Sequence, residues 1–128
     1  MTRRTRPEDA IQRAVIEHLR IRGSKGVVFW HTPNGAFYGG KRNRKGISIQ
    51  GAVMRGLGMR AGVSDVLLLH RARLYALEIK PEGGRATEAQ LAFIADVQAA
   101  GGFGCVAEGI DRALAVLEGW GLLRGRAQ

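Results

Sequence analysis

The sequence is poor in cysteine, in long apolar runs and in acidic residues, and each shortage narrows what the protein can be. Its one cysteine, Cys105, cannot form an intramolecular disulfide, and no Cys-x-x-Cys pair offers a zinc-binding spacing. No apolar stretch is long enough to cross a bilayer, and the N-terminus enters a charged segment without an apolar signal core. We therefore expect an unexported protein of the reducing cytoplasm, with no membrane contact.

The shortage of acidic residues gives the chain a strong positive charge. Eleven Asp and Glu stand against twenty Lys and Arg, so the formal net charge is +9. Such a balance is typical of proteins that bind a polyanion, and nucleic acid is the default partner. One group of cations lies in a glycine-rich segment, which we interpret as an exposed loop that contacts phosphates. This group consists of Lys41, Arg42, Arg44 and Lys45.

The length of 128 residues and the 45% hydrophobic content predict a single domain with a real core. Periodicity and turn signals predict helices over residues 7–22, 47–57, 88–99 and 111–118, and strands over residues 26–32 and 103–107. Thr87 and Gln90 fit a capping box at the start of the third of these helices. With the hairpin described next, the pattern predicts an α/β fold with a mixed central sheet flanked by helices.

The segment from Ser64 to Lys80 carries the strongest functional signal. Two apolar runs separated by the turn Arg71-Ala72-Arg73 predict an antiparallel hairpin, with Asp65 at its start and Glu78 and Lys80 at its end. Alternate residues of a strand share a face, so Glu78 and Lys80 point the same way, roughly 6–7 Å apart. Charged groups on apolar strands pair with each other, lie at an exposed end, or do chemistry. Two carboxylates and a lysine converging at one end of a hairpin indicate a metal-dependent nuclease.

In order and spacing these residues resemble the PD-(D/E)xK nuclease superfamily and, more narrowly, the VRR-NUC domain family, over nearly the whole chain. The motifs that carry the resemblance are Glu8 with Gln12, Pro33-Asn34-Gly35, Gly62-Val63-Ser64-Asp65, Glu78-Ile79-Lys80, and Gly84-Arg85-Ala86-Thr87 before Gln90. Ser64 stands where the superfamily's signature has proline, a position that mainly shapes the backbone before the aspartate. The resemblance implies a restriction-endonuclease-like fold with an αβββαβ core, and one VRR-NUC domain over residues 1–128.

The resemblance also implies an activity. It implies a Mg²⁺- or Mn²⁺-dependent endodeoxyribonuclease that hydrolyses phosphodiester bonds, selective for branched DNA such as four-way junctions or flaps, with no small-molecule cofactor. Similar small members are standalone phage or bacterial domains or modules of DNA repair enzymes, and they pair as homodimers. By the same resemblance, Asp65, Glu78 and the carbonyl of Ile79 are the metal ligands, and Glu8 adds a ligand directly or through water.

The remaining site residues have two interpretations each. Lys80 would orient the attacking water or stabilise charge in the transition state, and Gln90 would hold Lys80 or that water. The capping box with Thr87 competes for the Gln90 side chain. Glu8 is equally well explained as a surface acid that compensates the helix dipole. Arg85 is a candidate phosphate contact or a solvated loop residue.

Two other function classes stay open on the sequence. The chain could be a non-catalytic nucleic-acid-binding module, in which Glu78 and Lys80 form only an exposed ion pair worth little to stability. Alternatively, it could be an interaction subunit of a DNA repair or packaging complex. Metal binding separates the nuclease from both, because only the nuclease needs it.

Overall fold

The computed structural model describes residues 6–33 and 49–125, and these ranges contain four helices and four strands. In chain order they are α1 (Pro7–Arg22), β1 (Val28–His31), α2 (Ile49–Gly56), β2 (Val66–His70), β3 (Arg73–Lys80), α3 (Glu88–Ala99), β4 (Phe103–Glu108) and α4 (Gly109–Gly119). The predicted order is confirmed, and the predicted bounds of the helices and of β1 and β4 differ from the observed ones by at most two residues.

The four strands form one mixed sheet in the order β1-β2-β3-β4. β2 runs antiparallel to both β1 and β3, whereas β3 and β4 are parallel. The parallel pair needs a crossover connection, which α3 supplies. The predicted mixed sheet flanked by helices is therefore confirmed, and β3, which carries Glu78 and Lys80, lies between β2 and β4 rather than at an edge.

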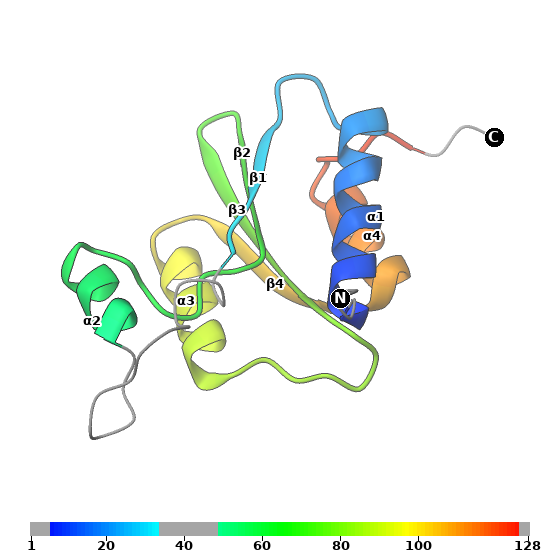
Figure 1. Cartoon of the computed structure of the whole chain (residues 1–128). Helices are drawn as coiled ribbons and strands as arrows, with labels where there is room; N and C mark the ends of the chain where they lie inside the picture. Colours follow the sequence, from blue (N-terminus) through cyan, green and yellow to red (C-terminus); the bar gives the residue numbers. More distant parts are fainter. Residues whose placement is uncertain (1–5, 34–48, 126–128) are drawn as a thin grey trace.

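The helices cover the two faces of the sheet unequally. α1 and α4 lie side by side on one face, and α3 lies on the other (Figure 1). On the face below α1 and α4, the side chains of Leu68, Leu77 and Ile79 are at most 1% exposed. They pack with a stripe from α1 (Ile11, Val15, Leu19) and with Leu114 and Leu117 of α4. Since each such burial contributes roughly 1.5–3 kcal/mol, the β2–β3 hairpin is anchored by the main core.

The end of α1 is tied to the segment that follows α4. Ser24 N donates to Leu122 O at 2.9 Å, and Arg124 N donates to Arg22 O at 2.7 Å. The Arg22 guanidinium also pairs with the Glu118 carboxylate of α4 at 2.6 Å. These contacts fix the C-terminal end of α1 against the C-terminal end of α4 and the segment that follows it.

The β2–β3 turn is shorter than the sequence predicted. Arg73 pairs with His70 in the ladder, so the turn consists of Arg71 and Ala72 alone, with φ of 51° and 65°. Two central residues with positive φ form a type I′ turn, whose twist matches that of the flanking strands. Neither residue is Gly or Asn, which is why the turn predicted at Arg71-Ala72-Arg73 was not recognised as a two-residue type I′ turn. The buried strands on either side offset the cost, which is about 1–3 kcal/mol for each strained residue.

α2 stands apart from the rest of the fold. Within the described residues it packs against no other helix or strand, and Figure 1 shows it beyond α3, away from the sheet. Its apolar side chains are open to solvent, with Val53 57% exposed and Leu57, directly after the helix, 79% exposed. Such an apolar surface on an isolated helix is unusual for a monomeric domain.

Across residues 6–33 and 49–125, no helix combines the length and the apolar content that a membrane crossing requires.

Gly62 provides a test of how closely α3 approaches the start of the hairpin. Gly62 has a φ of +80°, and a Cβ there would overlap the Ala89 carbonyl and lie 2.7 Å from Gln90 N. Gly58 has a φ of +104° but open space around its Cα. We expect Gly58→Ala to lower the free energy of unfolding by ~1 kcal/mol through backbone strain alone. Gly62→Ala should lower it by at least ~2 kcal/mol more, because the backbone of α3 must move.

Chemical denaturation of both variants measures this difference. Equal destabilisation by the two substitutions would contradict the close packing of Gly62 against the first turn of α3.

Candidate functional site

The hairpin brings Asp65 to the end of β3, as the sequence predicted. Asp65 directly precedes β2, and its Oδ2 accepts a hydrogen bond from Ile79 N at 2.8 Å. This bond places the carboxylate of Asp65 beside Glu78 and Lys80, the residues that flank Ile79. Side chains alternate between the two faces of a strand, which explains the positions of the other residues. The Ile79 side chain is 1% exposed in the core, while Glu78 and Lys80 lie on the opposite face.

Glu78 is a buried acid with an unsatisfied oxygen. The residue is 1% exposed, its Oε1 lies 3.5 Å from Lys80 Nζ, and its Oε2 has no hydrogen-bond partner among the described residues. Burial, followed by the neighbouring Asp65 carboxylate, raises the pKa of Glu78 to about 8, although Lys80 acts in the opposite direction. A buried oxygen without a partner costs on the order of 1–3 kcal/mol, so this arrangement weakens the fold.

The Glu78–Lys80 pair is buried, which removes one interpretation of the sequence. Lys80 is only 9% exposed, so the two residues do not form the exposed surface ion pair of the non-catalytic alternative. A buried pair loses hydration on both sides, and replacing it with apolar residues is often neutral or stabilising. Stability alone therefore gives little reason for these residues to occupy the middle strand of the sheet.

The backbone of Asp65 is held from β1. Its carbonyl accepts hydrogen bonds from Thr32 N at 2.9 Å and lies 3.0 Å from His31 Nδ1. Two buried hydroxyls have no partner among the described residues. They are Oγ1 of Thr32, whose backbone N–H contacts Asp65, and Oγ of Ser64, the residue directly before Asp65. The sequence indicated Ser64 only as a replaced proline, and it gave no signal for Thr32, because its place beside Asp65 depends on the β1–β2 pairing.

Gln90 closes the capping box of α3. Its Oε1 accepts a hydrogen bond from Thr87 N at 2.8 Å, and its own N donates to Thr87 Oγ1 at 3.2 Å. The amide oxygen is the side-chain atom of Gln90 that can accept from the Lys80 ammonium, and Thr87 N engages one of its two lone pairs. The predicted capping box is confirmed, while the contact with Lys80 stays a prediction.

The other predicted site residues lie at varied distances from this cluster. Glu8 is half-buried in the first turn of α1, and the described residues contain no group of three or more His, Cys, Asp or Glu that could hold a metal. Its role as a ligand stays a prediction. Arg85 is exposed in the loop between β3 and α3. The predicted loop cations Lys41, Arg42, Arg44 and Lys45 lie outside the described residues.

The donor set at the hairpin end fits a hard divalent cation. Mg²⁺ usually binds through one or two carboxylates and keeps several waters, so Asp65 and Glu78 meet its minimum requirement without a third acid. The Oε2 atom of Glu78, which has no hydrogen-bond partner among the described residues, is the kind of oxygen donor that such a cation takes. A cation beside it would stabilise the charged form that burial disfavours.

Comparison with known proteins supports the fold. No protein-family profile and no curated protein sequence matches the chain. Among solved structures, a VRR_NUC domain protein matches with a TM-score of 0.65 and 24% sequence identity, over 92% of this chain and 90% of that one. The chain therefore has the fold of a VRR_NUC domain protein, as its motifs predicted.

Proposed function

We propose that the chain is a nuclease of the VRR-NUC family, in which residues 1–128 form one domain that hydrolyses phosphodiester bonds in DNA with Mg²⁺ or Mn²⁺. The observation that carries the proposal is the Glu78 carboxylate, buried in the middle strand with a free oxygen, between Asp65 and Lys80. The shared fold with a VRR_NUC domain protein and the net charge of +9 support a nuclease-type domain that binds DNA.

Asp65 and Glu78 hold the cation, with the carbonyl of Ile79 as a further oxygen ligand and Glu8 reaching it directly or through water. When bound, Mg²⁺ or Mn²⁺ polarises the scissile phosphate and lowers the pKa of the attacking water. The Ile79 amide keeps the Asp65 carboxylate oriented, since one of its oxygens accepts that N–H. This division of roles leaves the second oxygen of Asp65 for the cation.

Lys80 stabilises negative charge on the phosphate as the bond breaks. Its ammonium lies 3.5 Å from Glu78 Oε1, so it shares the face of β3 that carries the carboxylate. Because the group is almost fully buried, its field is less screened than that of a surface lysine. Gln90 positions Lys80 through the second lone pair of its amide oxygen, or the water through its amide N–H groups, because the capping box engages only one lone pair. Arg85 and the cations of residues 41–45 contact the phosphates of the flanking DNA.

A non-catalytic binding module is the weaker alternative. Such a module gains affinity from exposed cations and has no need for two acids beside the bound phosphate, since they would repel it. The burial of Glu78 adds a cost to its charged form that Lys80 offsets in part, and a bound cation would relieve the remainder.

We further propose that the enzyme is a homodimer that acts on branched DNA. The support is α2, whose exposed apolar side chains have no partner helix or strand within the described residues. A second copy of the chain is a suitable partner, because a twofold pair presents two sites to the two strands of a symmetric junction.

Cleavage of a labelled panel of single strand, duplex, flap and four-way junction tests the activity. We expect cutting with Mg²⁺ or Mn²⁺, none with EDTA, and the branched substrates cut fastest. Asp65→Ala should lower the rate by at least ~100-fold. The variant loses a ligand of the cation, and with the cation it loses the stabilisation of negative charge on the phosphate. Asp96→Ala is the matched control, since Asp96 forms only a surface ion pair with Arg60. Binding without cutting under every metal would instead support the non-catalytic module.

The pH dependence of stability tests the buried acid. The folded-state pKa of Glu78 is raised from 4.5 to about 8, so its contribution to stability is full below 4.5 and is lost as pH rises to about 8. In EDTA at about pH 8, the isosteric Glu78→Gln variant should therefore be more stable than wild type by at least ~1.4 kcal/mol, the value of one pKa unit.

Chemical denaturation at about pH 5 and about pH 8 provides the readout. The advantage of Glu78→Gln should shrink at the lower pH, and added Mg²⁺ should stabilise wild type but not the variant. If the two proteins showed the same pH dependence, the charged Glu78 would not be the source of the cost.

Light scattering of the purified protein tests the dimer. We expect the mass of a dimer for wild type and of a monomer for Val53→Glu, because a buried unpaired carboxylate opposes association. A monomeric wild type at concentrations that support junction cleavage would refute the proposed assembly.

A further inference from the structure

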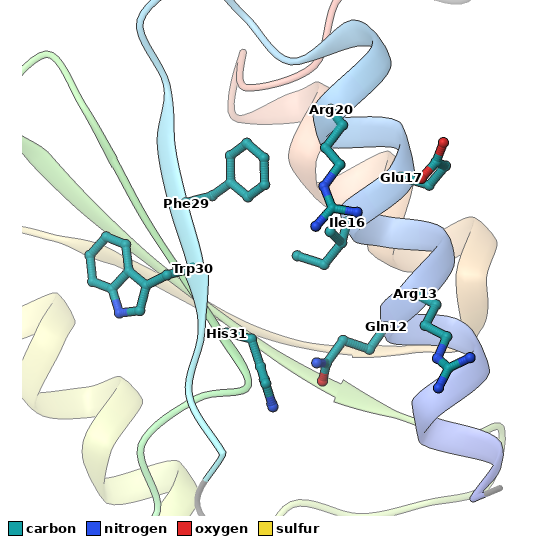
Figure 2. Close-up of a pocket in the computed structure, with 8 residues that line it drawn as sticks. All are labelled: Gln12, Arg13, Ile16, Glu17, Arg20, Phe29, Trp30 and His31. Carbon is teal, nitrogen blue, oxygen red and sulfur yellow. The ribbon is translucent and has the colours of Figure 1, made fainter.

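A cavity lies between α1 and β1, next to the site at the hairpin end (Figure 2). Its volume of about 490 Å³ falls within the range of small-ligand pockets. The polar and aromatic residues that line it are Gln12, Arg13, Glu17 and Arg20 of α1, with Phe29, Trp30 and His31 of β1. None of them has a role in the hydrolysis proposed above.

The β1 wall presents two rings. Phe29 and His31 extend from β1 toward α1, while Trp30 points to the other side of the strand (Figure 2). Residues two apart in a strand are separated by roughly 6–7 Å, which is close to twice the ~3.4 Å rise between stacked bases of one DNA strand. The two side chains can therefore flank one flat ring.

The α1 wall presents charge and hydrogen-bonding groups. Arg13 and Arg20 are exposed, and neither guanidinium forms an ion pair or hydrogen bond with the rest of the described chain. Figure 2 shows the Arg20 guanidinium beside Ile16, on the side of α1 that faces β1. Gln12 adds an amide, a group that pairs with the edges of bases, and Figure 2 shows it extending toward β1. Together, cations, rings and polar groups match the three parts of a nucleotide.

The cavity is joined to the hydrolytic site through the backbone. His31, at its floor, lies 3.0 Å through Nδ1 from the carbonyl of Asp65, and the next residue, Thr32, donates to the same carbonyl. A DNA strand whose phosphate lies at Asp65 and Glu78 therefore has its neighbouring nucleotide within reach of the cavity.

We infer that this cavity binds one unpaired nucleotide of the DNA substrate, adjacent to the scissile phosphate. The base stacks on Phe29 and His31, and Arg20, with Arg13 at the rim, contacts its phosphate. A paired base enters only by leaving its stack, which costs a few kcal/mol, so flaps and open junctions are favoured over intact duplex. This inference rests on the proposed function and supplies the origin of its selectivity.

Binding in EDTA tests the inference without any cleavage. The probes are a flap and a fully paired duplex of the same sequence, each with a fluorescent adenine analogue at the position that is unpaired in the flap. Wild type should quench the analogue in the flap and not in the duplex, because only the unpaired base can stack on protein rings. Absence of quenching in the flap overturns the inference.

Two variants and one control separate the two walls of the cavity. Phe29→Leu keeps an apolar side chain against the core and should lower flap affinity by ~5-fold or more, with duplex affinity unchanged. Arg20→Gln, on the exposed surface, should weaken flap binding and reduce the slope of log affinity against log salt by roughly 0.7. Arg71→Gln removes the same charge at the far end of the hairpin and should change neither quantity.

The outcomes for the cavity and for the nuclease are distinguishable. A protein that shows Phe29-dependent quenching but cuts no substrate supports the cavity and overturns the nuclease. A protein that cuts branched DNA, while Phe29→Leu and Arg20→Gln bind the flap like wild type, keeps the nuclease and overturns the cavity. Melting curves establish that each variant is folded, and the exposed Arg20 tests the cavity even if Phe29→Leu is unstable.

Discussion

The hydrogen bond from Ile79 N to Asp65 Oδ2 determines the geometry on which the candidate site depends. It joins two residues that are 14 positions apart in sequence, across the open end of the β2–β3 hairpin. It holds the carboxylate of Asp65 beside that of Glu78. From the other side, β1 holds the Asp65 carbonyl through the backbone of Thr32. Asp65, directly before β2, is thus hydrogen-bonded both to β3 and to the residue that follows β1. Backbone hydrogen bonds from neighbouring strands hold this residue in place, and such support is a condition for the precise geometry of a functional site.

The same geometry lowers the stability of the fold, because it buries charged groups in the sheet. Most buried residues of β3 are apolar, with Leu77 and Ile79 in the core. Glu78 and Lys80 break that rule, and the unpartnered oxygen of Glu78, together with its raised pKa, indicates a local cost to stability. The apolar contacts of the hairpin with α1 and α4 are what allow the chain to carry it. Local violations of this kind, supported by a consistent surrounding fold, are typical of functional sites.

The sequence predicted those features that depend on neighbours along the chain. The strand alternation at Glu78 and Lys80 and the capping box at Thr87 follow from local spacing, and both are present. The burial of Glu78 could not be predicted, since it depends on β4 and α3 covering β3. The cavity beside Phe29 was missed for the same reason, because its lining comes from α1 and from β1, and only the tertiary fold places these two segments on either side of one space. The turn at Arg71 and Ala72 was misjudged because neither residue type favours positive φ.

The contacts that tie Arg22 to Glu118 and Arg124 have a consequence for the order in which the protein folds. α1 buries its apolar stripe against α4 and the sheet, so its main helical partner is made about a hundred residues later on the ribosome. Contacts so distant in sequence form slowly, because a long loop must close before they contribute. The hairpin can assemble early from local pairing, but the wall of the cavity formed by α1 is placed only when α4 arrives. During synthesis, the pairing that brings Asp65 and Glu78 together can therefore form before the cavity between α1 and β1 does.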